Sequence, residues 1–232
     1  MIVPMIHRNL RREDLVCLVA EIAAADPLSA REAAHKLECG QIDLLLDLPG
    51  ALRAVRGRGG TPGALPLPIL WYVPVRALLR GRGEENITIA DFTATIPVAF
   101  VSSRSARRFG LGEPALTTWT RTLTSLPTGS VAQAERAAYC AALAIWWAGC
   151  FPERVNRSGG AGMLRAYIDF AAGAFERAAR ILHAKSPDTS SVYADASDKA
   201  EIICTTLRSA RENYLGKDKA DAELKRLLKG LG

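Results

Sequence analysis

Hydrophobic side chains recur at helical spacing along most of this chain, and they are densest between residues 131 and 153. From Ala137 to Phe151 the sequence runs without a single charged side chain. Ser130 stands where an N-cap is expected, and Pro152 stands where a helix should end. Because the stretch is apolar nearly all round, it predicts a helix over residues 130–151 that lies at the centre of a bundle.

The other apolar positions predict helices with one apolar face. In residues 10–24, for example, Leu15, Leu18 and Ile22 share a face, while charged residues lie elsewhere on the helix. The helices expected on this basis cover residues 10–24, 29–40, 41–47, 114–126, 163–184 and 192–215, with a turn over 49–55 and a short charged helix over 217–229. Loops are expected between them, including residues 102–113 and 157–162.

Several polar residues stand where helices should begin. Ser29 with Glu32, and Ser130 with Gln133, have the spacing of a capping box, in which the two side chains satisfy exposed backbone N–H groups. Thr88 is the expected N-cap of a further helix. In that helix Asp91 would occupy the third position, where a carboxylate interacts favourably with the helix dipole.

Two apolar segments, residues 69–80 and 88–101, contain the interior prolines Pro74 and Pro97. We predict helices that are kinked at these prolines, because proline removes one backbone hydrogen bond. Their valine, isoleucine and threonine content leaves a competing interpretation as extended strands. The strand interpretation concerns residues 69–75 and 95–101.

These elements predict an all-α fold, an irregular bundle of about 8–10 helices around the central helix. Residues 57–68 contain many glycine and proline residues and form either a surface loop or a linker. Residues 1–56 hold few large side chains for a core of their own, so a single helical domain over 1–232 is favoured. The alternative is a smaller N-terminal subdomain, residues 1–56, joined by that loop.

Composition and cysteine use indicate a cytoplasmic protein. The five cysteines, Cys17, Cys39, Cys140, Cys150 and Cys204, are spread widely and form no C-x-x-C pair. The first residues have no apolar segment of signal-peptide length before charges appear. The central apolar run is shorter than the roughly 20 residues that a membrane span needs. We therefore expect reduced thiols and no membrane insertion.

The motifs of common enzymes and cofactor sites are weak or missing, so no catalytic, cofactor-binding or metal-binding residue is predicted. Glu32 and His35 form one E-x-x-H step, but a di-iron bundle needs two such steps and further carboxylates. The glycine-rich segment 57–63 lacks the Lys-Ser/Thr pair of a phosphate-binding loop. A reaction would have to depend on residues that are scattered along the chain.

Positive charge is concentrated between residues 50 and 110. Nine arginines against Glu84, Glu85 and Asp91 leave this window with six net positive charges, which equals the formal charge of the whole chain. If they share one face, they predict a site for phosphate backbones or an acidic partner. The candidate basic patch comprises Arg53, Arg56, Arg58, Arg76, Arg80, Arg82, Arg104, Arg107 and Arg108.

Trp146 and Trp147 are adjacent in the central helix, where successive side chains point about 100° apart. At most one of them is expected to face the centre of the bundle squarely. The other would meet another helix, solvent or a partner. The pair is therefore a candidate hydrophobic interface, for example in a homodimer.

Three segments together resemble a family of uncharacterised bacterial all-helical proteins without an assigned function. They are LPILWYVPVRALL with the later ITIADFTATIPVAF, then AIWWAGCFPERV, and then LRSARENYL, so the resemblance covers about residues 65–215. It supports a single helical domain and implies no reaction. Pro74 and Pro97 depart from the family pattern, which has aliphatic residues there. The matching positions are Arg76, Asp91, Phe151, Pro152, Glu153, Arg208 and Tyr214.

Among the matching positions, Arg76 and Asp91 lie on successive helices. We expect them to form a partly buried ion pair that joins the two helices. The first functional hypothesis is a non-enzymatic interaction or regulatory protein that self-associates or binds a protein partner. The alternatives are a nucleic-acid-associated protein that uses the basic patch, and an enzyme with a site assembled from scattered residues.

Overall fold

A computed structural model describes residues 2–57, 65–102, 116–125, 127–160 and 162–215 of the chain. Within these ranges the fold is all-α, as the sequence predicts, with thirteen α-helices and no strand. The number exceeds the expected 8–10, because several short helices were not anticipated. The prediction for residues 217–229, and most of those for the loops 57–68 and 102–113, lie outside the described ranges.

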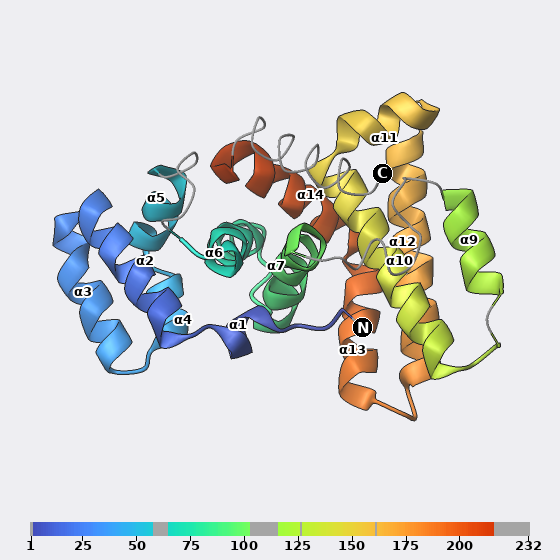
Figure 1. The fold of residues 1–232 in the computed structure, drawn as a ribbon, viewed down its shortest axis with the longest axis horizontal. Helices are drawn as coiled ribbons and strands as arrows, with labels where there is room; N and C mark the ends of the chain where they lie inside the picture. Colours follow the sequence, from blue (N-terminus) through green and yellow to red (C-terminus); the bar gives the residue numbers. More distant parts are fainter. Residues whose placement is uncertain (1, 58–64, 103–115, 126, 161, 216–232) are drawn as a thin grey trace.

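The helices follow one another across an elongated molecule (Figure 1). One end is an N-terminal unit of four helices, defined here as α2–α5. Helices α6 and α7 stand in the middle, where α1 passes along α7 and α14 contacts α6, and α9–α13 form the other end. The bounds are α1 Ile6–Asn9, α2 Arg12–Ala25, α3 Pro27–Glu38, α4 Ile42–Leu46, α5 Pro49–Gly57, α6 Leu67–Arg80, α7 Ile87–Ser102, α9 Leu116–Thr124, α10 Val131–Cys150, α11 Pro152–Gly159, α12 Met163–Leu182, α13 Pro187–Asp198 and α14 Ala200–Ala210, which a π-helical turn, η1 Arg211–Leu215, continues.

The predicted central helix is confirmed as α10, which is buried over nearly its whole length. It packs against α12 and α14, and it also contacts α7, α9 and α11. Its many alanines let these neighbours approach closely. Ser130 caps it as predicted, since the Gln133 N–H donates to the Ser130 hydroxyl at 3.1 Å. The Gln133 side chain reaches one residue further than expected and accepts from the Gly129 N–H at 2.9 Å.

Pro74 and Pro97 both lie inside α-helices, so the strand interpretation of residues 69–75 and 95–101 is wrong. The segments are long enough for three or more helical turns, and both are buried among other helices. Their β-branched residues therefore satisfy packing rather than a pleated sheet. Local propensity is a weak signal when tertiary contacts cover the whole segment.

Two predicted helix starts are wrong by a few residues. Helix α3 begins at Pro27 with Asp26 as its N-cap, because Asp26 accepts the Leu28 N–H at 3.2 Å. Ser29 instead lies in the first turn. Helix α7 is capped by Asn86, whose side-chain oxygen accepts the Thr88 N–H at 2.9 Å. In both cases a nearby Asx side chain takes the position; Asn86 is a stronger cap than Thr88, whereas Asp26 and Ser29 are about equally good caps.

Other boundaries differ because the chain breaks or continues its helices at unforeseen points. The expected helix 192–215 is divided at Lys199 into α13 and α14. The residues after Pro152 form α11, where only a loop from residue 157 had been expected. Helix α1 was not predicted at all. Within the described ranges, no helix is both long and apolar enough to cross a membrane.

Candidate functional site

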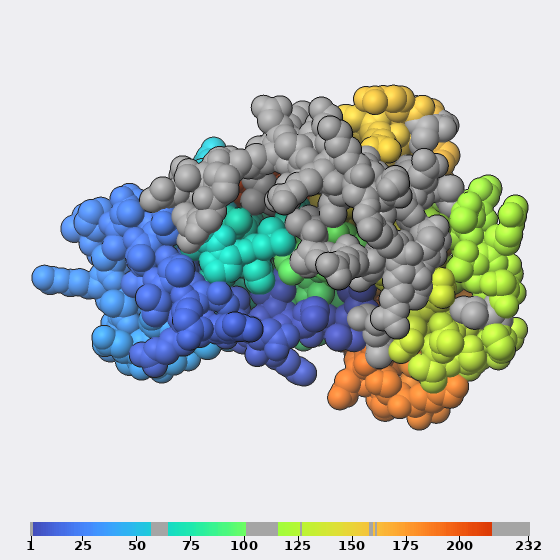
Figure 2. Space-filling model, in the orientation of Figure 1, coloured from blue at the N-terminus to red at the C-terminus, as the bar shows by residue number. Residues whose placement is uncertain are grey.

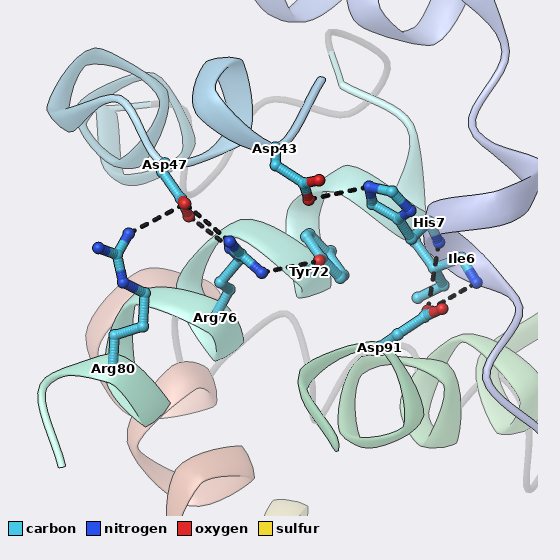
Figure 3. A network of polar contacts seen from close by, with 8 residues as sticks. All are labelled: Ile6, His7, Asp43, Asp47, Tyr72, Arg76, Arg80 and Asp91. Carbon is cyan, nitrogen blue, oxygen red and sulfur yellow. Dashed lines mark hydrogen bonds and ion pairs between the residues drawn. The ribbon is translucent and has the colours of Figure 1, made fainter. Parts of the chain in front are cut away.

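The most extensive polar network of the described residues lies where the N-terminal unit meets α6 and α7 (Figure 3). We call it the seam network. It brings together side chains from α1, the α4 region, α6 and α7. Its members are Ile6 and His7, through their backbone N–H groups and the His7 ring, with Asp43, Asp47, Tyr72, Arg76, Arg80 and Asp91.

Asp47, at the C-terminal end of α4, binds two arginines of α6. Arg76 donates to both carboxylate oxygens, with Nη2 at 2.7 Å from Oδ2, and Arg80 Nη1 lies 3.0 Å from Oδ2. Arg76 and Arg80 are one turn apart on α6, so both reach the same carboxylate. The Arg76 side chain is 9% exposed and that of Arg80 is 47% exposed. Arg76 is therefore the buried member of this triad.

The buried position of Arg76 also affects Tyr72, one turn earlier on α6. Arg76 Nη1 lies 3.4 Å from the Tyr72 hydroxyl. The hydrogen bonds to Asp47 raise the pKa of Arg76 above its usual range, despite the opposing effect of burial. Burial raises the pKa of Tyr72 to about 12, although the nearby guanidinium opposes this rise. Tyr72 is thus a neutral hydroxyl and Arg76 a cation at physiological pH.

The prediction that Arg76 and Asp91 form an ion pair is wrong. Each of them instead connects its own helix to a different neighbour. Arg76 points toward α4 and pairs with Asp47, which is 29 residues earlier in the chain. Asp91 lies on the face of α7 that meets α1. Its Oδ1 accepts the backbone N–H groups of Ile6 at 2.8 Å and His7 at 3.2 Å. Sequence proximity suggested a contact between neighbouring helices, but each side chain faces a different neighbour.

Asp91 therefore caps α1 from another helix. The first N–H groups of a helix have no partner within it, and α1 has no capping contact from its own preceding side chain. Burial holds the pKa of the Asp91 carboxyl above its usual range, and the two backbone hydrogen bonds only partly offset this effect. The carboxylate supplies the acceptors that a four-residue helix needs.

His7 completes the network beside Asp91. Its Nε2 lies 3.0 Å from Asp43 Oδ1, which joins α1 to α4. Its ring centroid lies 6.0 Å from that of Tyr72. The seam network thus links α1, α4, α6 and α7 through ionic and polar contacts that connect the N-terminal unit to the middle of the molecule.

We expect Asp91→Ala to lower the free energy of unfolding by about 1–3 kcal/mol, because the buried Ile6 N–H and the partly buried His7 N–H lose their acceptor. Asp91→Asn keeps an acceptor oxygen, so its effect should stay within about 1 kcal/mol. The raised pKa means that folding favours the protonated acid. The protonated Asp91 carboxyl therefore adds to the free energy of unfolding below pH 3.8, the ordinary pKa of the group. This stabilisation is lost as the pH rises through the raised pKa of the folded state.

Urea denaturation of both variants between pH 3 and pH 7 tests this prediction. Asp91→Asn should remove the part of the pH dependence of the free energy of unfolding that arises from the Asp91 carboxyl. Equal destabilisation by alanine and asparagine at pH 7 would show that the two N–H contacts contribute nothing.

Four of the five described members of the predicted basic patch, all but Arg56, make contacts with different parts of the chain. Arg53 pairs with Asp26, and Arg76 and Arg80 share Asp47. Arg82 donates to the hydroxyls of α14, at 2.6 Å to Thr206, 2.9 Å to Thr205 and 3.2 Å to Ser209. Arg56 is exposed at the end of α5, and Arg58, Arg104, Arg107 and Arg108 lie outside the described residues.

The candidate interface at Trp146 and Trp147 is not an exposed surface. Both side chains are buried within the chain, at 6% and 1% exposure. Trp146 stacks on Phe100 at 5.2 Å between centroids and meets Phe151 edge-on at 5.1 Å. The two indoles meet each other edge-on at 5.3 Å between centroids, and both also contact Phe151. Of the three outcomes left open for the second indole, burial within the same chain is the one observed. The sequence did not distinguish them, because the number of neighbouring helices could not be counted from it.

The remaining positions of the family resemblance gather at the C-terminal end of α10. Arg211 is buried, lies 3.3 Å from a Glu153 carboxylate oxygen and 5.4 Å from the Phe151 ring centroid. Arg208 donates to the Ala148 carbonyl at 3.3 Å. The dipole of α10 favours a cation at this C-terminal end. Pro152 begins α11, and Tyr214 is partly buried. These contacts join α10, α11 and α14.

His35 and Glu32 form no metal centre. The His35 ring nitrogens lie 3.7 and 3.8 Å from the Cys39 sulfur at the end of α3. Within the ranges that the structure describes, no group of three or more His, Cys, Asp or Glu side chains is placed to hold a metal ion.

Sequence reasoning missed His7, Asp43, Asp47 and Tyr72 as members of the seam network. Two signals were available: Asp47 is a carboxylate at the end of an apolar helix, and Tyr72 and Arg76 are four residues apart on one face. Neither signal predicts which side chain these residues contact, because the contacting residues lie in other helices. Comparisons of the chain with known protein families, with curated proteins and with solved structures gave no match.

Proposed function

We propose that this protein is a non-enzymatic helical interaction or regulatory protein, which self-associates through its N-terminal unit or binds a protein partner there. The observation that supports this proposal is Leu28, which is 93% exposed in the first turn of α3. Val16 and Leu44 of the same unit are also exposed. Figure 2 shows this unit as the blue end of the molecule, remote from α9 and α13.

The exposed position of Leu28 is held by polar contacts of Asp26, two residues earlier in the chain. Asp26 accepts the Leu28 N–H and the Ser29 hydroxyl, the latter at 2.7 Å. Arg53 of α5 pairs with the same carboxylate. The start of α3 is therefore anchored to α5, so Leu28 is an apolar side chain held out on a fixed helical turn. Burying it at an interface would contribute about 1.5–3 kcal/mol.

Sedimentation of the wild-type chain and of Leu28→Asp tests the proposal. We expect the wild-type protein to associate at micromolar concentration and Leu28→Asp to weaken the association at least tenfold, since about 1.4 kcal/mol corresponds to a factor of ten. Val131→Asp is the matched control. Val131 is also exposed in the first turn of a helix, where aspartate suits the dipole.

The control should associate like the wild-type chain. Equal weakening by both variants would contradict a surface at Leu28. A wild-type chain that remains monomeric at all micromolar concentrations would contradict self-association. The five free cysteines support a cytoplasmic location, which we include in the proposal.

A nucleic-acid-associated role is the second proposal. The contacts of Arg82 favour it: among the described residues its partners are neutral oxygens of α14, and none of them is a carboxylate. A gel-shift titration at two salt concentrations tests this role, because binding through phosphates weakens steeply with salt. The absence of a shift at low salt would remove the second proposal and leave the first unaffected.

A further inference from the structure

An N-terminal strap, defined as residues 2–9, crosses α7 and reaches α13 (Figure 1). Its backbone is held by side chains of those two helices. The Ile6 and His7 N–H groups donate to Asp91, and the Met5 N–H lies 3.4 Å from the Thr95 hydroxyl. The Tyr193 hydroxyl donates to the Ile2 carbonyl at 2.8 Å. Every one of these contacts joins residues that are at least 84 apart in the chain.

Two isoleucines anchor the strap. Ile2 and Ile6 are four residues apart, are both buried and belong to the main hydrophobic core. Met5, between them, is 43% exposed. The strap thus has two apolar anchors in an I-x-x-x-I pattern, an exposed Met5 beside the half-buried Val3 and Pro4, and a helical turn at its end.

This arrangement resembles the recognition of a short peptide more than the packing of two helices. The strap-binding face, which we define by Asp91, Thr95 and Tyr193, contacts main-chain groups that every residue carries. Specificity comes from the two buried isoleucine positions, as in other modes of peptide recognition. A four-residue helix has no stability of its own, so α1 depends on these contacts.

We infer that the strap is a tethered ligand and that the strap-binding face accepts a matching segment from another protein chain when the strap leaves it. The partner's segment would be extended like the strap, would carry two aliphatic side chains four residues apart and would end in a helical turn. The inference rests on the proposed interaction role and names the class of partner. It uses a face of α7 and α13, whereas Leu28 lies on the N-terminal unit, which the strap contacts through His7 and Asp43.

The tether explains why the strap occupies this face in the isolated chain. A segment joined to its binding face by a short linker acts at an effective concentration of about millimolar. A free segment with the same contacts must compete against it. Weakening the strap should therefore strengthen binding of the free segment, whereas weakening the face should abolish it.

The test uses the full-length chain and a fluorescent peptide of residues 2–10, IVPMIHRNL, with binding followed by anisotropy. Ile6→Asp removes one anchor of the tethered strap and leaves the face intact. We expect this variant to bind the peptide at least tenfold more tightly than the wild-type chain does. Met5→Asp, the control, adds the same charge to the same strap at an exposed position and should bind like the wild-type chain.

Adding Asp91→Ala to the Ile6→Asp chain should weaken peptide binding at least tenfold. A folded Ile6→Asp chain that binds no more tightly than the wild type would overturn the inference. Loss of helical circular dichroism in Ile6→Asp would also overturn it, because the strap would then be an indispensable part of the core. The Leu28→Asp sedimentation result does not depend on this experiment, so the two proposals can fail separately.

Discussion

Arg76→Ala should lower the free energy of unfolding by about 3 kcal/mol, the lower end of the range for breaking a buried ion pair. The guanidinium of Arg76 donates to both oxygens of Asp47 and contacts the Tyr72 hydroxyl. Its loss leaves Asp47 mostly buried with Arg80 as its remaining ion-pair partner. Urea denaturation at pH 7 measures the change.

Arg80→Ala is the matched control, since it removes the same side chain, one turn later, from the same carboxylate. Arg80 is 47% exposed, and exposed ion pairs contribute about 0–1 kcal/mol. We expect Arg80→Ala to lower the free energy of unfolding by less than about 1 kcal/mol. Equal losses in the two variants, or an unchanged stability of Arg76→Ala, would contradict the role of Arg76 as the buried connection between α4 and α6.

Gly149→Ala should destabilise the contact between α10 and α14. A Cβ at residue 149 would lie 3.0 Å from the Cys204 carbonyl oxygen and 3.0 Å from the Leu207 Cβ. The carbonyl belongs to the backbone of α14, so the clash is relieved only if the helices move apart. Overpacking of this kind costs about 1–3 kcal/mol.

Gly173→Ala, within α12, serves as the control for helix propensity. No atom lies within 4 Å of a Cβ added at residue 173. Alanine is favoured over glycine in a helix by roughly 1 kcal/mol, and both variants share this gain. We therefore expect Gly173→Ala to raise the free energy of unfolding. The difference in free energy of unfolding between the two variants then measures the cost of the overpacking between α10 and α14. Thermal or urea unfolding measures both, and two stabilised variants would contradict the close approach of α10 and α14.

The predictions from sequence were most accurate where one segment contains all the information. Helix α10 is an example, because an apolar run between Ser130 and Pro152 specifies its length, its cap and its burial. The starts of α3 and α7 were less accurate, because Asp26 and Asn86 competed with the expected caps nearby. Trp146 and Trp147 show a further limit, since their burial depends on how many elements surround α10.

The amino-acid sequence by itself determined the all-helical class, the central position of α10 and the presence of charged residues that join helices. These follow from periodicity, capping and burial, which act within a few turns of one chain segment. Only the tertiary structure decided that Arg76 pairs with Asp47, that Asp91 caps α1 and that the strap reaches Tyr193. The physical reason is that a side chain's partner depends on which helix face its own helix meets. That choice is made by packing between segments 29 to 191 residues apart.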